Sequence, residues 1–324
     1  MFKDIWYVTY DNFIELIFLE EALNAYNTFH EPHEINVIVN EYLESTAIKI
    51  RNRIKALPQD NIKLKVYIPS DILTVEELKK IKKTQDFFDF PGFGWITQQY
   101  LKLAIYRKSN AKFSYVFDCK NIPVKPNAIE HVSNNHNFSP NPLPNSGFDN
   151  YKNYLRNLGI LKNKDLVYAH RAVNTPFIFN NKILHSMFNT LDVFSLIFLH
   201  YKFLDDWEEF QNFLSLGILV SEIILYYSYI DYQGLDVDTD SNTPSINHWI
   251  QDGIKRPWMT NLNLEDWIRQ HNYDHDDGFV DFPVLPYNIT YYITAHRRQL
   301  EQELLEDPTL QRFKKFIRRS LRDY

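Results

Sequence analysis

Three ionisable side chains stand where the sequence favours chemistry: Asp118, Lys120 and Glu222. Asp118 ends the run 113–117 (FSYVF), which is aromatic and β-branched and therefore predicts a buried strand. The prolines that follow it exclude a helix directly after the strand. A carboxylate at the C-terminal end of a buried strand lies where open α/β sheets bind ligands. Asp118 is therefore the first candidate for a reaction centre, and the alternative is a carboxylate that caps a turn.

Polar side chains before and after Asp118 in the sequence are further candidates for the site. Lys120 follows Asp118 by two residues, and an ammonium group can pair with phosphate oxygens as a point charge. The alternative for Lys120 is a solvated loop lysine. Gln98 and Lys102 lie four residues apart in a helix predicted from about 95 to 108, so both project from one face. That face is either part of the site or an ordinary wet surface.

Glu222 lies in the apolar run LSLGILVSEIILYYSYI, where an unpaired ionised group is expensive to bury. Such a carboxylate is usually paired, or it lies in a cleft with a raised pKa. A pKa raised toward neutrality suits a general base that deprotonates a hydroxyl. The alternative is a structural glutamate bonded to the backbone or to a tyrosine.

Bulk composition excludes several classes of protein. The chain has 324 residues, a net charge of −6, 24 Phe and 21 Tyr, and its single cysteine is Cys119. The acidic balance argues against a nucleic-acid partner engaged through the whole surface. One cysteine excludes an intramolecular disulfide and a cysteine-rich zinc site. The N-terminal residues lack a signal-peptide pattern, and the apolar stretch 214–230 is too short to span a bilayer, so we expect a cytoplasmic protein.

Strands alternate with helices from the first residues onward, which predicts a mostly parallel sheet with helices on both faces. The predicted strands are 5–9, 34–39, 63–68, 113–117, about 165–169 and 175–179; the predicted helices are 12–29, 44–56, 74–83, 95–108, about 151–158, 182–203 and 208–229. An α/β domain over 1–235 is expected to be followed by a mostly helical extension over 236–324. The proline- and asparagine-rich segment 127–148 reads as a long loop, of a kind that forms lids, binding loops or disordered segments.

The basic tail 310–324 (LQRFKKFIRRSLRDY) places Leu310, Phe313, Ile317 and Leu321 on one helical face. A basic amphipathic helix either lies on an anionic membrane surface or docks on its own domain by that face. The acidic loops 236–240 and 274–278 fail the calcium-loop pattern. The sequence contains no phosphate-binding P-loop, dinucleotide fingerprint or nucleophile elbow.

Several motifs occur together in an order that resembles the GT-A nucleotide-sugar glycosyltransferases. They are an N-terminal strand ending in Thr9 and Tyr10, a third strand ending in Ser70 and Asp71, the helix GWITQQYLKL (94–103), the strand ending in Asp118, Thr-Pro-Phe at 175–177 and Ser-Glu at 221–222. The GWxxQQxxKL helix resembles an uncharacterised glycosyltransferase-like branch with a degenerate DxD motif. This resemblance covers roughly residues 4–232.

The resemblance implies sugar transfer from a nucleoside-diphosphate donor to a glycan or lipid-linked acceptor hydroxyl, in surface-polysaccharide synthesis. It also implies donor-site residues, namely Thr9, Tyr10, Asp71, Gln98, Gln99, Lys102, Asp118 and Lys120. Glu222 would be the base, which implies inversion at the anomeric carbon. A sugar-transfer role is compatible with a soluble cytoplasmic enzyme. It is also compatible with an enzyme attached peripherally to the inner face of a membrane through residues 310–324.

The sequence departs from the family at the metal site. GT-A enzymes usually carry Asp-x-Asp, whose carboxylates hold Mn²⁺ or Mg²⁺ against the donor diphosphate, with Asp118 as the matching ligand here. In this chain Lys120 stands where the second aspartate is expected, and an ammonium group repels a cation. Two interpretations follow: a metal-independent enzyme in which Lys120 replaces the ion's charge, or a non-catalytic sugar- or partner-binding module that has kept the fold.

Overall fold

The computed structural model describes residues 4–9, 13–28, 33–57, 59–87, 93–119, 121–123, 146–162, 177–199, 201, 208, 216–234 and 279–281. Every structural statement below concerns these residues. The predicted strand near 165–169, most of the loop 127–148 and the helices expected beyond residue 235 lie outside them.

A five-stranded, mostly parallel sheet forms the centre of this part of the chain, in the order β3-β2-β1-β4-β6. The strands are β1 (Asp4–Thr9), β2 (His33–Val39), β3 (Ile62–Tyr67), β4 (Phe113–Asp118) and β6 (Phe177–Asn180). Strand β1 pairs in parallel with β2 and with β4, whereas β6 pairs antiparallel to β4 at the sheet edge. The predicted α/β class and the mostly parallel sheet are confirmed.

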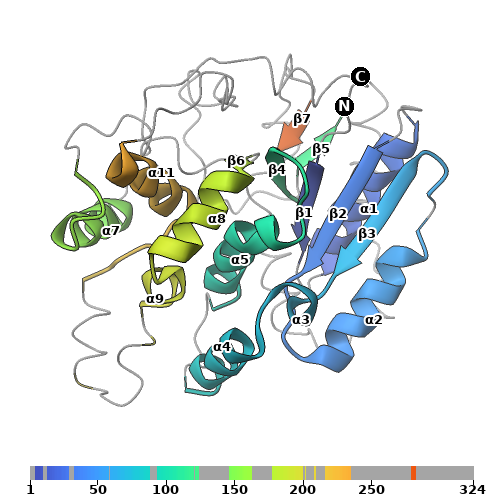
Figure 1. Cartoon of the computed structure of the whole chain (residues 1–324). Helices are drawn as coiled ribbons and strands as arrows, with labels where there is room; N and C mark the ends of the chain where they lie inside the picture. The colour runs from blue at the N-terminus through green and yellow to red at the C-terminus, as the bar shows by residue number, and fades with distance from the viewer. Residues whose placement is uncertain are drawn as a thin grey trace, which may run out of the picture.

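Helices flank the sheet (Figure 1). They are α1 (Phe13–Thr28), α2 (Glu44–Lys55), α3 (Pro69–Ile72), α4 (Val75–Phe87), α5 (Phe93–Ala104) with the 3₁₀ turn η1 (Ile105–Arg107), α7 (Ser146–Asn157), α8 (Asn181–Thr190), α9 (Val193–Ile197) and α11 (Glu222–Gln233). Helices α1 and α2 cover one face and α5 covers the other (Figure 1). Right-handed crossovers require this arrangement, because the chain moves outward from β1 to β3 and then returns to the other side of β1.

Strand β1 shows why both faces are covered, because its side chains alternate between the two layers. Trp6 and Val8 belong to the core under α5, and Trp6 stacks on Tyr67. Tyr7 points the other way, where its hydroxyl meets that of Tyr26 on α1 at 3.3 Å. A strand buried on both faces reads as a continuous apolar run, which is what the sequence shows at 5–8.

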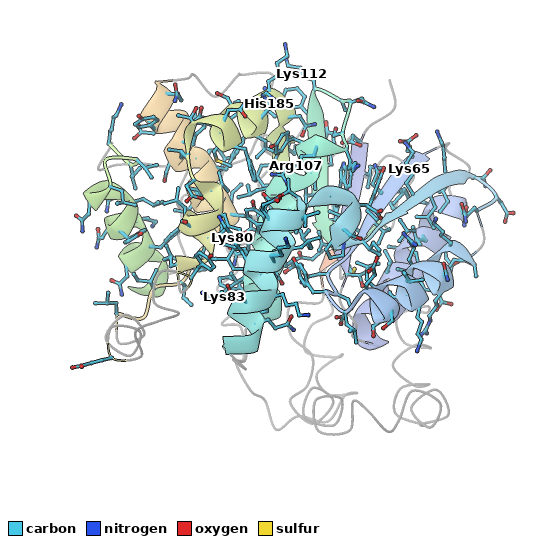
Figure 2. All side chains as sticks on the ribbon, turned by 60° about the horizontal axis from the view of Figure 1, so that its bottom comes forward. Lys65, Lys80, Lys83, Arg107, Lys112 and His185 are labelled. Atoms are coloured by element: carbon cyan, nitrogen blue, oxygen red, sulfur yellow. The ribbon has the colours of Figure 1, made fainter. Side chains whose placement is uncertain are left out.

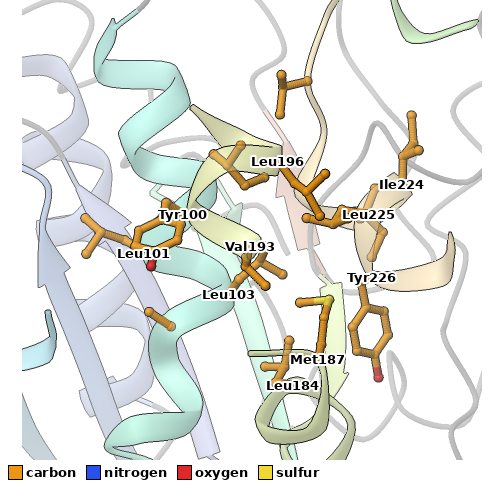
Figure 3. Packing of buried hydrophobic residues seen from close by; sticks show 14 of the residues in the cluster. Tyr100, Leu101, Leu103, Leu184, Met187, Val193, Leu196, Ile224, Leu225 and Tyr226 are labelled. Atoms are coloured by element: carbon orange, nitrogen blue, oxygen red, sulfur yellow. The ribbon is translucent and has the colours of Figure 1, made fainter. Parts of the chain in front are cut away.

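A second layer of helices packs behind α5. Tyr100, Leu101 and Leu103 of α5, Leu184 and Met187 of α8, Val193 and Leu196 of α9, and Ile224, Leu225 and Tyr226 of α11 share one buried cluster (Figure 3). The hydroxyl of Tyr226 accepts a hydrogen bond from the backbone N–H of Asn180 at 2.9 Å, which ties α11 to the end of β6. The position of α11 against the sheet is therefore fixed by both apolar packing and a buried hydrogen bond.

Two predicted helices are shorter than the apolar pattern indicates. The helix predicted over 182–203 is broken between α8 and α9, where Asp192 accepts a hydrogen bond from Ser195 N–H and caps α9. The prediction of one helix over 208–229 is wrong at residues 216–221, which are not helical. Gly217 there has a φ of 57°, and Ser221 caps α11, so the helix begins at Glu222. Residues 216–220 are apolar in sequence although Leu216 and Leu219 are exposed, so the apolar pattern hid the break before α11.

Helix α4 is clamped to the end of α5 by an ion pair. Arg107, labelled in Figure 2, donates from Nη1 and Nη2 to the two carboxylate oxygens of Glu77 at 2.7 and 2.8 Å. The hydroxyl of Tyr100 also donates to Glu77. Bidentate geometry is the strong form of an arginine–carboxylate contact, and here it fixes α4 against the turn η1 that follows α5.

The remaining described elements correct and extend the predictions. Helix α7 begins at Ser146, so the predicted loop ends three residues before 148. Strand β5 (Asn121–Pro123) pairs antiparallel with β7 (Phe279–Asp281), a strand in the C-terminal segment that the sequence did not predict. No helix in the described ranges has the length and apolar character needed to cross a bilayer.

Candidate functional site

The candidate site lies at the carboxyl ends of β1 and β4, where the strand order reverses. Chain connections leave β1 toward β2 on one side and reach β4 on the other, and open α/β sheets bind ligands at such a switch point. Asp118 is the last residue of β4 and pairs in register with Val8 of β1. Its side chain is 24% exposed, so the carboxylate is accessible at this edge.

Helix α5 supplies the groups that contact Asp118. Lys102 Nζ lies 2.7 Å from Asp118 Oδ1, and Gln98 Nε2 lies 3.5 Å from the same oxygen. The spacing of four residues puts both side chains on one face, as the sequence predicted. The lysine side chain is 5% exposed and its ammonium lies 5.2 Å from the ring centroid of Phe177 on β6. The helical face is therefore part of a buried ionic cluster and not a wet surface.

Glu222 joins the same cluster from α11. Its Oε1 lies 3.3 Å from Lys102 Nζ, and its side chain is 7% exposed. As the first residue of α11 its backbone N–H has no partner within the helix. The side-chain oxygen of Gln99 accepts that N–H at 2.8 Å, while Ser221 caps the N–H of Ile224. Glu222 is thus a residue of the first helical turn, and the prediction that it lies inside a long apolar helix is wrong.

The cluster of Lys102, Asp118 and Glu222 carries one positive and two negative charges when all three are ionised. Burial lowers the pKa of Lys102, but the neighbouring charges of Asp118 and Glu222 outweigh burial and raise it above its ordinary value. Burial raises the pKa of Glu222, and Lys102 offsets only part of that increase. At neutral pH the lysine is therefore a fixed cation, and Glu222 takes up a proton more readily than an exposed glutamate.

The described residues do not form a set of metal ligands. No group of three or more histidine, cysteine, aspartate or glutamate side chains in the described ranges could hold an ion. Asp118 already faces an ammonium group at 2.7 Å, and that charge repels a divalent cation. Among the described residues Lys102 is the cation that pairs with this carboxylate, and the motif resemblance had placed Lys102 in the donor site without giving it this role.

The other residues predicted for the donor site are placed differently. Thr9 ends β1 beside Asp118, but its side chain is fully buried and its carbonyl accepts the N–H of Asn40 at 2.7 Å. Asp71 lies beyond β3, three strands or about 14 Å from β4. Its carboxylate accepts the N–H of Ile68 at 2.9 Å and lies 3.5 Å from Arg51. Asp71 therefore has a local structural role in this structure, while Tyr10 and Lys120 lie outside the described residues.

One contributor and one contact were not predicted from the sequence. Phe177 was named only within a predicted strand and the Thr-Pro-Phe motif, and its ring centroid lies 5.2 Å from the ammonium of Lys102. Gln99 was expected to contact a donor, yet it is 1% exposed and orients Glu222. The spacing of four residues between Gln98 and Lys102 was the sequence pattern that predicted a shared face on α5. No pattern in the sequence indicates that Gln99 bonds to Glu222.

The chain matches no known protein family and no curated protein sequence. Among solved structures, one similar chain is mouse xyloside xylosyltransferase 1 in its apo form, with 10% identity and a TM-score of 0.33. The similarity covers 72% of this chain and 82% of that chain. At this identity and TM-score the likeness does not assign an activity.

Proposed function

We propose that this protein is a glycosyltransferase that uses a nucleoside-diphosphate sugar. The observation that carries the proposal is the partly exposed carboxylate of Asp118 at the strand-order reversal, held by Lys102 at 2.7 Å. Open α/β sheets bind ligands at this point, and a fixed carboxylate there accepts hydrogen bonds from ribose or sugar hydroxyls. The resemblance in motif order to GT-A enzymes supplies the reaction class.

The three ionic residues would have different roles. Asp118 would contact the donor, because it is the member of the cluster with an exposed carboxylate. Lys102 would act as a positioning residue, since two carboxylates already surround its buried ammonium group. The cluster is acidic overall, so the donor diphosphate needs a cation from elsewhere, and Lys120 is proposed for that contact.

Glu222 is proposed as the general base of an inverting transfer. Its raised pKa suits proton acceptance from a hydroxyl, and the bond that forms at the anomeric carbon would release that proton. Because Glu222 is 5% exposed, it would receive the acceptor hydroxyl in a site from which water is largely excluded. The competing role is purely positional: the carboxylate would hold Lys102 and never meet substrate.

The acceptor class and the location in the cell are proposed from sequence alone. A glycan or lipid-linked acceptor in surface-polysaccharide synthesis is consistent with the basic tail 310–324, which would bring the enzyme to the inner face of a membrane. A vesicle-binding assay on the full chain and on a chain ending at residue 309 tests the contact. Equal binding of both to anionic vesicles would remove the tail from the proposal.

Thermal shift with a panel of nucleotide sugars tests the donor. A ligand present at 100 times its Kd stabilises the fold by about 2.7 kcal/mol, which is readily detected. Asp118→Asn should lose most of the shift, while Asp60→Asn, at an exposed position, should keep it. The same panel is then assayed for slow donor hydrolysis. A native chain that no nucleotide sugar stabilises would refute the proposed function.

A non-catalytic sugar-binding module is the second candidate, and one observation favours it. Lys102 and Glu222 satisfy each other inside the protein, as structural ion pairs do, and neither needs a substrate to complete its contacts. Binding without hydrolysis or transfer, across the whole panel and with acceptor glycans present, would select this function over catalysis.

A further inference from the structure

A tryptophan stands exposed at the start of the helix that builds the site. Trp95 is 39% exposed, the highest value among the Phe, Tyr and Trp side chains that the structure describes. No other large apolar side chain on α5 is exposed. An indole ring left in water forgoes the burial that aromatic residues usually gain, and a ligand that covered Trp95 would restore part of it.

Trp95 lies on the same stripe of α5 as the groups of the site. Gln98, Gln99 and Lys102 follow it at three, four and seven residues, which is the spacing of one helical face. Seven residues advance an α-helix by about 10 Å and return to within about 20° of the starting direction. Trp95 therefore stands about two turns from Lys102 on the face that meets Asp118.

The direction of α5 places Trp95 at the ligand-binding edge of the sheet. Strand β4 follows α5 through η1 and runs toward Asp118, so α5 runs the opposite way and begins at the carboxyl edge. A hydrogen bond confirms this: Asn40 Nδ2, just beyond β2, donates to Gly94 O at 2.7 Å. The indole thus lies beyond the end of β4, on the solvent side of the ionic cluster.

We propose that Trp95 is a stacking platform for a carbohydrate ring whose hydroxyls bond to the partly exposed carboxylate of Asp118. Sugar rings present an apolar C–H face and a rim of hydroxyls, so an aromatic face on the same helical stripe as the groups around a carboxylate is complementary to them. A protein partner would need a larger apolar patch than one exposed ring on this helix provides. The inference rests on the proposed function in taking the ring to be the donor sugar or the acceptor.

Calorimetric titration of the full chain separates these sources. The probes are the tightest nucleotide sugar of the thermal-shift panel, its nucleoside diphosphate without sugar, and the tightest free oligosaccharide of a glycan array. Trp95→Ala and Trp95→Gln should weaken binding of one carbohydrate probe by about tenfold, and Trp95→Phe by less, because an aromatic face remains. Leu158→Ala is the control, since it truncates an exposed apolar side chain at the end of α7 and should change nothing.

The pattern of losses decides the outcome. Weakening confined to the nucleotide sugar assigns the donor ring, and weakening confined to the oligosaccharide assigns the acceptor. If the Trp95 variants weaken binding of the plain nucleoside diphosphate as much as that of the nucleotide sugar, Trp95 stacks on the nucleobase and the proposal is overturned. Unchanged affinity in both Trp95→Ala and Trp95→Gln would also overturn it. A native chain that binds neither carbohydrate probe would overturn it too. Trp95-dependent oligosaccharide binding without any nucleotide-sugar binding would refute the transferase function and keep the platform.

Discussion

The side-chain oxygen of Gln99 accepts the backbone N–H of Glu222 at 2.8 Å, across 123 residues of sequence. Both residues are buried, and the amide nitrogen of Gln99 has no hydrogen-bond partner among the residues that the structure describes. This contact ties the first turn of α11 to α5, beside the ion pair between Lys102 and Glu222. The site is thus assembled from one helix that precedes β4 and another that follows β6.

Replacing Gln99 by methionine should destabilise the fold by about 1 kcal/mol. The change leaves the N–H of Glu222 buried without an acceptor, which costs about 1–3 kcal/mol, but it also removes the unpartnered amide nitrogen. Urea unfolding measures the loss, with Gln85→Met at an exposed site of α4 as the control. A variant as stable as the native chain would show that water or another group satisfies this N–H.

Lys102→Met should destabilise the protein by about 3–5 kcal/mol at pH 8, the range for removing one partner of a buried ion pair. The change removes the cation that pairs with both Asp118 and Glu222, and Glu222 is almost fully buried. Lys49→Met, on the exposed face of α2, is the matched control and should lie within about 0.5 kcal/mol of the native chain.

The cost of Lys102→Met should shrink as pH falls from 8 to 5.5. Burial already raises the pKa of Glu222, and Lys102 is the main influence that lowers it, so the variant has a still higher pKa. A carboxyl whose folded-state pKa exceeds its unfolded value favours folding below the unfolded pKa and loses that contribution as pH rises through the folded pKa. Unfolding free energies that differ between variant and native by the same amount at both pH values would contradict this coupling.

Glu222→Gln should lower turnover by about 10²- to 10⁴-fold if the residue is the base, with little change in donor affinity. Glutamine keeps the shape of the side chain, and the melting temperature shows whether the fold survives. Transfer at the native rate would exclude the catalytic role. Loss of donor binding together with loss of turnover would instead indicate that Glu222 acts through Lys102 and Asp118.

Donor binding should survive treatment with EDTA, since Lys120 stands in place of the second aspartate and Lys102 faces Asp118. Calorimetry with and without Mn²⁺ or Mg²⁺ measures this directly. Lys120→Ala should weaken nucleotide-sugar binding by about 1.5–3 kcal/mol, the range for a hydrogen bond to a charged group. Binding that appears only when a divalent ion is added would refute the metal-independent mechanism.

The sequence by itself determined the four parallel strands over residues 4–118 and four of the five α-helices between them, whereas the short helix α3 was not predicted. Strong alternation of buried strands with amphipathic helices predicted β1 to β4 within about one residue at each end, because local hydrophobic periodicity and turn residues specify such elements. It also placed Asp118 at a strand end and put Gln98 and Lys102 on one face, since both follow from the geometry of a single element.

Only the tertiary structure decided which charges meet. The sequence assigned Lys120 the charge of the missing metal ion, and Lys120 lies outside the described residues. The pairing of Lys102 with Asp118 and Glu222 was visible only in the structure. The sequence also read Glu222 as part of a long helix, because the loop before α11 is as apolar in sequence as the helix itself, although Leu216 and Leu219 of that loop are exposed. Contacts between α5, β4 and α11 join residues up to 123 positions apart. Such pairings depend on how the layers pack, and no local pattern in the sequence records them.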